Sequence, residues 1–476
     1  MRNVRPNDWH NPQPAGRYDL IVLGAGTAGL SAARMAAMRG KKVALIERDL
    51  LGGTSLNTGC LPSKTIIRTS RLYGEMRHAE NYGVSVPADI QVDFPAAMLR
   101  MRRIRAHVSR LDSARDLAAS GVDVFFGVAR FCGADAVMLD GTRLRFKRAV
   151  IATGAHPKTP AIPGLVEAGY FTNESIFDLT ELPRRILVIG GGPLGCEMAQ
   201  AFCRFGAQTT IVQNWPLFLP REERDAAQIL SDAFASDGIE IRLDTRVVNV
   251  RVQGDEKIVD LVHDDYKNSI TVDAILTGTG RAPNVDGLDL EAAGVAYDSS
   301  RGVHVDDFLR TANARIYAAG DVCLEHKFDD TAEASARIVV ENALFHGRQR
   351  LSRLTIPWCT YTDPEIAHVG LYVRQAREQG ISVKTFTVPM HEVDRAIADG
   401  EETGFVKIHV REDTDEIVGA TIVARHAGEM ISELTLAIVA GIGLRKLATV
   451  IHPYPTQAGA IRQAADAYER TRIAPS

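Results

Sequence analysis

The sequence predicts an α/β protein with two Rossmann-type nucleotide-binding domains. Two glycine-rich turns support this fold class, GAGTAG at residues 24–29 and GGGPLG at residues 190–195. Each turn follows a short apolar run and precedes a helical pattern of small and apolar residues, and a second apolar run comes next. A strand, a glycine-rich turn, a helix and a second strand form the unit that binds a dinucleotide.

The first unit consists of YDLIVL, the turn with Gly24, Gly26 and Gly29, the stretch LSAARMAAMRG, and VALIE, which ends at Glu47. The glycines allow the backbone to approach a pyrophosphate, and the N-terminus of the following helix stabilises its charge. Glu47 stands 23 positions after Gly24, where a carboxylate accepts hydrogen bonds from ribose hydroxyls. We therefore expect these four residues to bind the first dinucleotide.

The second unit has Gly190, Gly192 and Gly195 in its turn, and the same spacing of 23 residues leads to Gln213. Two such units in one chain predict two dinucleotides, FAD and NAD(P)H. A carboxylate at the position of Gln213 favours NADH, whereas an arginine attracts the 2′-phosphate of NADPH. Glutamine does neither, so the sequence leaves NADH and NADPH open.

The composition narrows the class of protein further. With 476 residues, of which 45% are hydrophobic, the chain is long enough for about three domains. Its net charge of −4 gives no reason to expect a nucleic acid or a membrane as partner, and no apolar run approaches the roughly 18 residues of a spanning helix. The six cysteines show no C-x-x-C spacing, so we expect no metal site and a reducing, cytoplasmic setting. Residues 1–16 are polar and proline-containing, which predicts a flexible extension.

A loop at residues 52–64, GGTSLNTGCLPSK, indicates the kind of chemistry. It resembles the redox-active loop of the class I pyridine nucleotide-disulfide oxidoreductase family, which includes dihydrolipoamide dehydrogenase, glutathione reductase and mercuric reductase. That family has two cysteines in this loop, whereas here Ser55 holds the first position and Cys60 the second. A serine hydroxyl cannot take part in disulfide exchange, because exchange needs a thiolate that attacks sulfur.

The resemblance assigns a role to several residues of this loop. It implies that Cys60 is the thiol that faces the flavin and that Gly53 and Thr54 contact FAD. Pro62 predicts that a helix begins just after Cys60, and Lys64 adds a cation one turn away. Both features predict a lowered pKa for the Cys60 thiol.

Further motifs of the same family imply the domain plan. Thr153-Gly154 and Gly280-Arg281 mark the crossings between the two nucleotide-binding domains, and Gly320-Asp321 places an aspartate on the ribityl chain of FAD. TDPEIAHVG at residues 362–370 opens an α+β dimerisation domain, in which FVKIHV and EIVGATIVA show the alternation of half-buried strands. The expected segments are an extension at 1–16, a FAD domain at 17–155 and 282–353, a NAD(P) domain at 156–281 and a dimerisation domain at 354–476.

Three more residues complete the predicted catalytic set with Cys60. The resemblance pairs Lys64 with Glu197 beside the flavin and the nicotinamide. Near the C-terminus, HPYPTQAG at residues 452–459 places Tyr454 and Gly459 where dithiol-reducing members carry a histidine and a glutamate. That histidine protonates a departing thiol, whereas a phenol with a pKa of roughly 10 does not titrate near neutral pH. His452 is expected to be structural.

These observations predict an FAD-dependent oxidoreductase that passes hydride from NAD(P)H to FAD and then electrons to a non-dithiol acceptor. Oxygen, a quinone, a metal ion or a small thiol compound all remain open as that small-molecule acceptor. Two alternatives also remain. One is a disulfide or mercuric-ion reductase in which an external thiol works with Cys60, and the other is a redox-responsive FAD-binding protein with little turnover. The resemblance implies a homodimer in which Tyr454 lies over Cys60 of the partner subunit.

Overall fold

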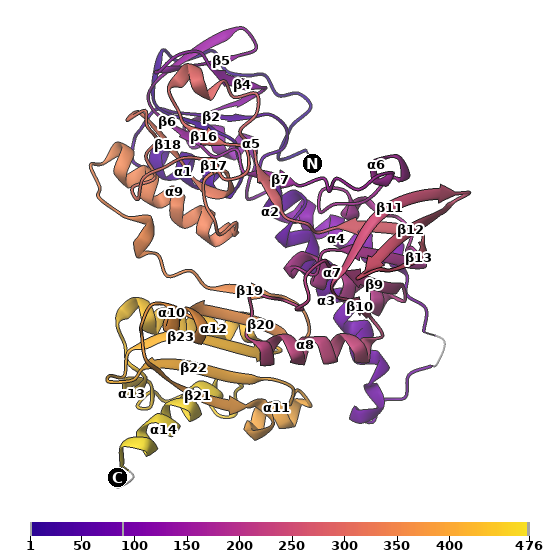
Figure 1. Cartoon of the computed structure of the whole chain (residues 1–476). Coiled ribbons are helices and arrows are strands. Elements are labelled where there is room, and N and C mark those ends of the chain that lie inside the picture. Colours follow the sequence, from indigo (N-terminus) through magenta and orange to yellow (C-terminus); the bar gives the residue numbers. More distant parts are fainter. Residues whose placement is uncertain (1, 88–89, 474–476) are drawn as a thin grey trace.

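Three large β-sheets organise the chain (Figure 1). The computed structural model describes residues 2–87 and 90–473. Residue 1 of the expected extension and residues 474–476 of the expected C-terminal domain lie outside this description. Short 3₁₀ helices connect several elements: η1 (Ala79–Tyr82), η2 (Ile176–Asp178), η3 (Leu290–Ala293), η4 (Gly320–Val322), η5 (Leu351–Arg353) and η6 (Met390–Glu392).

The first sheet has a parallel core with an antiparallel edge, in the order β3-β2-β1-β6-β5-β4 and with β18 beside β6. Its strands are β1 (Arg17–Leu23), β2 (Val43–Glu47), β3 (Val122–Phe126), β4 (Ala129–Phe131), β5 (Ala136–Leu139), β6 (Thr142–Ile151) and β18 (Ile316–Ala318). The helices α1 (Thr27–Met38), α5 (Ala114–Ala119) and α9 (Asp329–Leu344) pack on this sheet. The helices α2 (Gly53–Asn57), α3 (Cys60–Arg77) and α4 (Phe94–Val108) contact one another, and α3 and α4 share an apolar core with the region of the second sheet. Nearly every residue of the parallel strands β1 and β2 is buried, because helices and loops cover both faces of such a sheet.

The second sheet is wholly parallel, in the order β10-β9-β8-β14, and a three-stranded antiparallel sheet accompanies it. The elements of this region are α6 (Leu165–Ala168), β8 (Arg185–Ile189), α7 (Pro193–Phe205), β9 (Gln208–Val212), α8 (Arg224–Asp237), β10 (Glu240–Arg242), β11 (Thr245–Gln253), β12 (Glu256–His263), β13 (Tyr266–Val272) and β14 (Ala274–Thr277). The chain enters this region through β7 (Ala155–Pro157) and leaves it through β15 (Arg281–Pro283), and these two strands pair with each other. The small hairpin of β16 (Tyr297–Asp298) and β17 (Gly302–Val303) follows.

The third sheet is antiparallel, in the order β19-β20-β23-β22-β21. Its strands are β19 (Trp358–Thr360), β20 (Glu365–Gly370), β21 (Val383–Pro389), β22 (Phe405–Arg411) and β23 (Ile417–Ala424). The helices of this region are α10 (Val373–Glu378), α11 (Asp394–Asp399), α12 (Ala427–Ala440), α13 (Leu444–Leu447) and α14 (Gly459–Ile473). The predicted strands FVKIHV and EIVGATIVA coincide with β22 and β23. The α/β class with an α+β C-terminal region is therefore confirmed.

The segment at residues 2–16 differs from the flexible extension that its composition predicted. Val4 is completely buried, and the side chain of Asn11 exchanges two hydrogen bonds with the backbone of Phe126. Composition gave no sign of these contacts, because the partners lie far along the chain. Among the described residues, no helix has both the length and the apolar surface to cross a bilayer.

Candidate active site

The first glycine-rich turn forms a cradle in which backbone segments pack against each other. Gly24 has a φ of +97°, and a Cβ at this position would lie 2.4 Å from the carbonyl oxygen of Ala152. At Gly53 an added Cβ would lie 2.5 Å from the Cα of Gly26. Helix α1 begins directly after Gly26 and has no acidic residue in its first turn, so its positive end is free to stabilise an anion.

Glu47 is fixed at the end of β2 beside this cradle. One oxygen of its carboxylate accepts the backbone N–H of Ala25 at 2.8 Å, and the other accepts the N–H of Asp49 at 2.8 Å. Burial raises the pKa of Glu47, although these two hydrogen bonds act in the opposite direction. The structure thus places an oriented carboxylate next to the turn, as a ribose site requires.

Arg281 lies between two residues that sequence analysis assigned to FAD. Its guanidinium donates to Thr54 Oγ1 at 3.2 Å, and its Nε lies 3.5 Å from the carboxylate of Asp321. The Nε is buried and has no hydrogen-bond partner within the part of the chain that the structure describes. A buried donor of this kind is costly unless another polar group satisfies it, so these residues fit a polar ligand such as FAD. Gly320, next to Asp321, has a φ of +74°.

The two motifs that were predicted to mark the domain crossings are connected by hydrogen bonds. Thr153 Oγ1 donates to the carbonyl of Asn284 at 2.7 Å, and the Asn284 amide donates to the carbonyl of Thr153 at 2.7 Å. The Asn284 N–H also binds the carbonyl of Gly154. Gly154 and Gly280 have φ values of +71° and +104°, which glycine adopts at little cost.

The second cradle repeats this construction around α7. An added Cβ at Gly190 would lie 2.7 Å from the carbonyl of Gly278, and one at Gly195 would lie 2.0 Å from the carbonyl of Gly190. A Cβ at Gly192 would meet nothing within 4 Å among the described residues, so a ligand can approach there. Gln213 is buried and donates to the carbonyl of Leu217 at 2.7 Å.

Lys64 and Glu197 form a buried ion pair, as the family resemblance implied. The Nζ of Lys64 lies 3.1 and 2.9 Å from the two carboxylate oxygens of Glu197, whose side chain is 4% exposed. The backbone N–H of Tyr361 donates to the same carboxylate at 3.0 Å, and the Lys64 Nζ lies 4.5 Å from the centre of the Tyr361 ring. Glu197 lies in the second turn of α7. Helices α3 and α7 and the third-sheet region thus meet at one carboxylate.

Cys60 begins α3, as predicted, but the predicted lowering of its pKa is wrong. Burial of the sulfur and the neighbouring Asp329 carboxylate raise the pKa of the Cys60 thiol to about 12, and Lys64 offsets them only in part. Cys60 nevertheless keeps an exposed surface. The sequence showed Lys64 and the helix start, because both lie close to Cys60 in the chain. The sequence gave no sign of Asp329, which is the first residue of α9 and lies far from Cys60 in the chain. Its carboxylate accepts a hydrogen bond from Thr27 Oγ1 at 3.2 Å.

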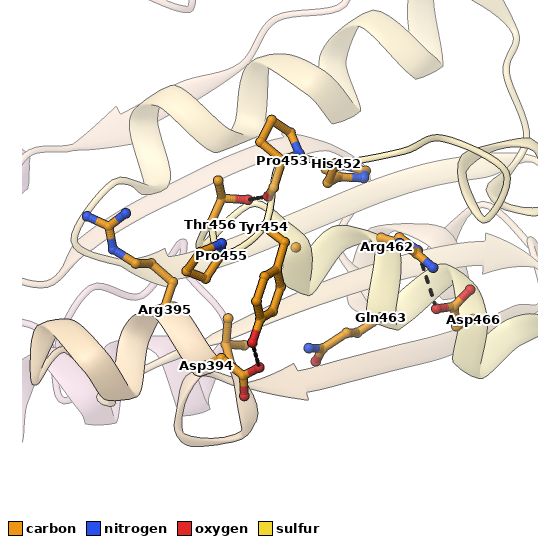
Figure 2. A pocket seen from close by; sticks show the side chains of 12 residues that line it. Asp394, Arg395, His452, Pro453, Tyr454, Pro455, Thr456, Arg462, Gln463 and Asp466 are labelled. Atoms are coloured by element: carbon orange, nitrogen blue, oxygen red, sulfur yellow. Dashed lines mark hydrogen bonds and ion pairs between the residues drawn. The ribbon is translucent and has the colours of Figure 1, made fainter.

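Tyr454 lies in a separate pocket of about 250 Å³ on the C-terminal domain (Figure 2). Its hydroxyl donates to the carboxylate of Asp394 at 2.8 Å, and its side chain points toward that residue. The hydrogen bond raises the pKa of Tyr454 above its ordinary value. His452 in the same loop lies 2.9 Å from the carboxylate of Glu433. None of Cys60, Lys64 and Glu197 lines this pocket, so one chain does not bring the four predicted catalytic residues together.

The fold and these two cradles define a flavin-dependent oxidoreductase that uses two dinucleotides, FAD and NAD(P)H. Residues 18–341 match the family model described as pyridine nucleotide-disulphide oxidoreductase, and residues 356–465 match the dimerisation domain of that family. The chain belongs to the class I pyridine nucleotide-disulfide oxidoreductase family, whose members are FAD-dependent enzymes.

Known relatives fall into several branches of this family. A mercuric reductase from Lysinibacillus sphaericus is 32% identical over 95% of this chain and 83% of its own. One from Streptomyces lividans is 34% identical over 95% of this chain and 96% of its own. A dihydrolipoyl dehydrogenase from Thermus scotoductus is 31% identical over 96% of this chain and 98% of its own.

Solved structures of flavoprotein reductases are also similar to this chain over nearly its whole length. The Cu(II) complex of the HOCl-induced flavoprotein disulfide reductase RclA from Escherichia coli has a TM-score of 0.85 with 27% identity, over 95% of this chain and 99% of its own. LpdA from Mycobacterium tuberculosis has a TM-score of 0.86 with 28% identity, over 95% of this chain and 100% of its own.

Proposed function

We propose that this protein passes hydride from NAD(P)H to FAD and then delivers electrons to a non-dithiol acceptor. The observation that carries the proposal is the single thiol of the redox loop. Ser55 occupies the position of the first family cysteine, five residues before Cys60, and all six cysteines of the chain, which lie within the described residues, are free. An intramolecular dithiol therefore has no second sulfur in this loop.

FAD supplies a carrier that accepts hydride and releases electrons to an acceptor. We assign its binding to Gly24, Gly26, Gly29, Glu47, Gly53, Thr54, Thr153, Gly154, Gly280, Arg281, Gly320 and Asp321. We assign NAD(P)H to Gly190, Gly192, Gly195 and Gln213. The ion pair of Lys64 and Glu197 links α3 to α7, and we propose that this link helps to fix the distance between the flavin and the nicotinamide. A fixed distance favours hydride transfer, because the reacting atoms must approach within about 3.5 Å.

We propose that Cys60 acts as a protonated thiol beside the flavin and not as the thiolate that its position in the loop predicted. Its raised pKa keeps the sulfur protonated at neutral pH, with Asp329 as its neighbour. A protonated thiol is a poor nucleophile, so this state fits a site that does not work by thiol–disulfide exchange, and Asp329 favours it. Asp329 is therefore a further proposed member of this site.

The acceptor site is proposed to be completed by a second copy of the chain. The dimerisation-domain match supports a homodimer, as do exposed apolar side chains on the same domain: Leu436, Val439 and Ile451, which are 64%, 65% and 90% exposed. Leu436 and Val439 are three residues apart on α12 and so share one face of that helix, and a contiguous apolar patch is typical of an interface. In such a dimer, Tyr454 of the partner subunit lies over Cys60.

The central experiment is anaerobic mixing with NADH and, separately, with NADPH, followed by reoxidation with oxygen, a quinone, Cu(II), Hg(II) or oxidised glutathione. We expect the flavin band to bleach with at least one nucleotide and one non-dithiol acceptor to restore it quickly. Dithionite titration should then consume one two-electron equivalent per FAD. Uptake of a second equivalent that disappears after alkylation of thiols would contradict the proposal.

A disulfide or mercuric-ion reductase that uses an external thiol is a second candidate. The exposed surface of the Cys60 residue favours it, because an external thiol can approach this position from solvent. The named activities of the mercuric reductase relatives also point in this direction. This candidate requires that reoxidation by Hg(II) or a disulfide depends on added thiol and is lost in Cys60→Ser. Reoxidation that needs no added thiol and is unchanged in Cys60→Ser would exclude this candidate.

A further inference from the structure

The segment at residues 2–16 is bound to the chain through its backbone near its start. The carbonyl of Val4 accepts the N–H of Leu51 at 3.2 Å, and the carbonyl of Asn3 accepts the N–H of Ala114 at 3.0 Å. The Val4 side chain packs in the apolar cluster that contains Leu51. Complete burial of a valine contributes about 1.5–3 kcal/mol, so this contact is a substantial anchor.

Arg5 forms hydrogen bonds with the loop that follows β2. Its guanidinium donates to the carbonyls of Arg48 and Asp49 at 3.2 and 3.3 Å and to the Asp49 carboxylate at 3.2 Å. The same guanidinium lies over the ring of Phe126, 5.5 Å from its centre. One side chain thereby joins the end of β2 to the end of β3.

Trp9 and Asn11 hold the end of β3. The indole N–H of Trp9 donates to the carbonyl of Val124 at 3.3 Å, and its ring meets the Phe126 ring edge-on at 5.9 Å. The Asn11 amide donates to the carbonyl of Phe126 at 2.8 Å and accepts the Phe126 N–H at 2.8 Å. These are the two hydrogen bonds that a neighbouring strand would make with this residue.

The loop after β2 and the end of β3, which residues 2–16 contact, also shape the proposed FAD cradle. Asp49 donates its N–H to Glu47, and the N–H of Gly52 donates to the carbonyl of Ala25 at 2.8 Å. The N–H of Gly127, directly after β3, donates to the carbonyl of Glu47 at 2.9 Å. The contacts of Val4, Arg5 and Asn11 thus lie within one or two residues of a group that positions Glu47 or the turn before Gly53.

We propose that residues 2–16 are a latch that holds the β2–α2 loop and the end of β3 in the FAD-binding arrangement and so slows FAD release. The family match begins at residue 18, so this latch is an addition to the part that the family model covers. Its effect follows from preorganisation, because a loop that is already ordered loses less entropy when the ligand binds. The inference rests on the assignment of Glu47 and Gly53 to FAD.

The test compares FAD release from four purified holoenzymes, the unchanged chain and three variants, after dilution, with FAD measured in the filtrate over time. We expect Arg5→Ala to release FAD about tenfold faster, which corresponds to about 1.4 kcal/mol, and deletion of residues 2–14 to release it faster still. Asp8→Ala is the matched control, since it removes an ion pair with Arg115 whose side chains are 70% and 62% exposed. Such pairs contribute little, so its release rate should match that of the unchanged chain.

The rate of flavin reduction with FAD in excess separates this inference from the proposed function. The latch predicts the same rate in Arg5→Ala and in the unchanged chain, because the segment touches neither Lys64 nor Glu197. Release rates within twofold of the unchanged chain, equal acceleration by Asp8→Ala, or slow reduction in excess FAD would each overturn it. If the deletion variant fails to fold, Asn11→Ala together with Arg5→Ala decides the outcome.

Discussion

The Lys64–Glu197 centre and the Tyr454 pocket differ in how much of each site one chain supplies. Glu197 is buried and receives hydrogen bonds from two other regions of the same chain. Tyr454 is 82% exposed, and its one hydrogen-bond partner among the described residues is Asp394 of the same domain. Under the proposed function, hydride entry is built within the protomer, whereas electron exit uses a surface that a second copy completes.

The largest expected effect is on the enclosed site. Glu197→Gln should slow anaerobic flavin reduction by about a hundredfold, because loss of the ion pair shifts α7 against α3. Loss of one partner of a buried pair also costs about 3–5 kcal/mol. We expect the low end, because the Lys64 side chain is 32% exposed. Stopped-flow reduction and thermal unfolding measure the two effects, and Glu256→Gln, at an exposed pair with Arg185, is the control. An unchanged rate of flavin reduction in Glu197→Gln would contradict the proposed difference between the Lys64–Glu197 centre and the Tyr454 pocket.

The comparison is tested next by rebuilding a dithiol site. Ser55→Cys alone should raise activity on lipoamide or oxidised glutathione only slightly, because Tyr454 and Gly459 remain. The triple variant with Tyr454→His and Gly459→Glu should raise it by about a hundredfold, the usual effect of an acid–base group. A Cβ at Gly459 meets nothing within 4 Å among the described residues, so the glutamate has room at its first carbon. Equal activity of the single and triple variants would show that the pocket does not serve this site.

Tyr454→Phe should affect only the second half of the reaction. We expect about tenfold slower reoxidation, the effect of one lost hydrogen bond to a charged partner, with flavin reduction unchanged. Asp394→Asn should give a smaller decrease, since it weakens the bond that orients the phenol. Slower reduction in either variant would mean that the two sites are not separate.

The comparison can be sharpened at Cys60 itself. Its pKa is raised to about 12, so alkylation of the thiol should increase as pH rises toward that value and be slow near neutrality. Asp329→Asn removes a carboxylate that raises this pKa, so the alkylation midpoint should move to lower pH. Mass spectrometry of the Cys60 peptide in the apoenzyme measures the midpoint. A midpoint near 9 in the unchanged chain would show that the thiol is not held protonated.

The smallest effect is expected at Gln213. A carboxylate at the end of β9 repels the 2′-phosphate of NADPH, so Gln213→Glu should shift kcat/KM toward NADH by about tenfold. Steady-state kinetics with both nucleotides measure the ratio. Flavin reoxidation should not change, and a change there would argue against the assignment of this residue.

Local motifs predicted the parts of the site that are continuous in sequence. The turns around Gly24 and Gly190, the start of α3 at Cys60 and the paired Lys64 and Glu197 all follow from residue types at short spacings or from family motifs. Asp329 and Asp394 were missed because each contacts its partner only after the chain has folded. The pKa of Cys60 was predicted in the wrong direction for the same reason. Desolvation depends on the whole fold, whereas a helix N-terminus and a nearby lysine are visible in a few residues.

The hydrogen bond from Tyr361 to Glu197 has a thermodynamic consequence for the assembled enzyme. Tyr361 immediately follows the β19 strand of the domain that pairs the subunits, and Glu197 lies on the helix that opens the nicotinamide cradle. If association of the subunits changes the position of that backbone amide, it changes the affinity for NAD(P)H, and NAD(P)H must then change the affinity between subunits by the same factor. Under that condition, subunit association and NAD(P)H binding are coupled through the carboxylate of Glu197.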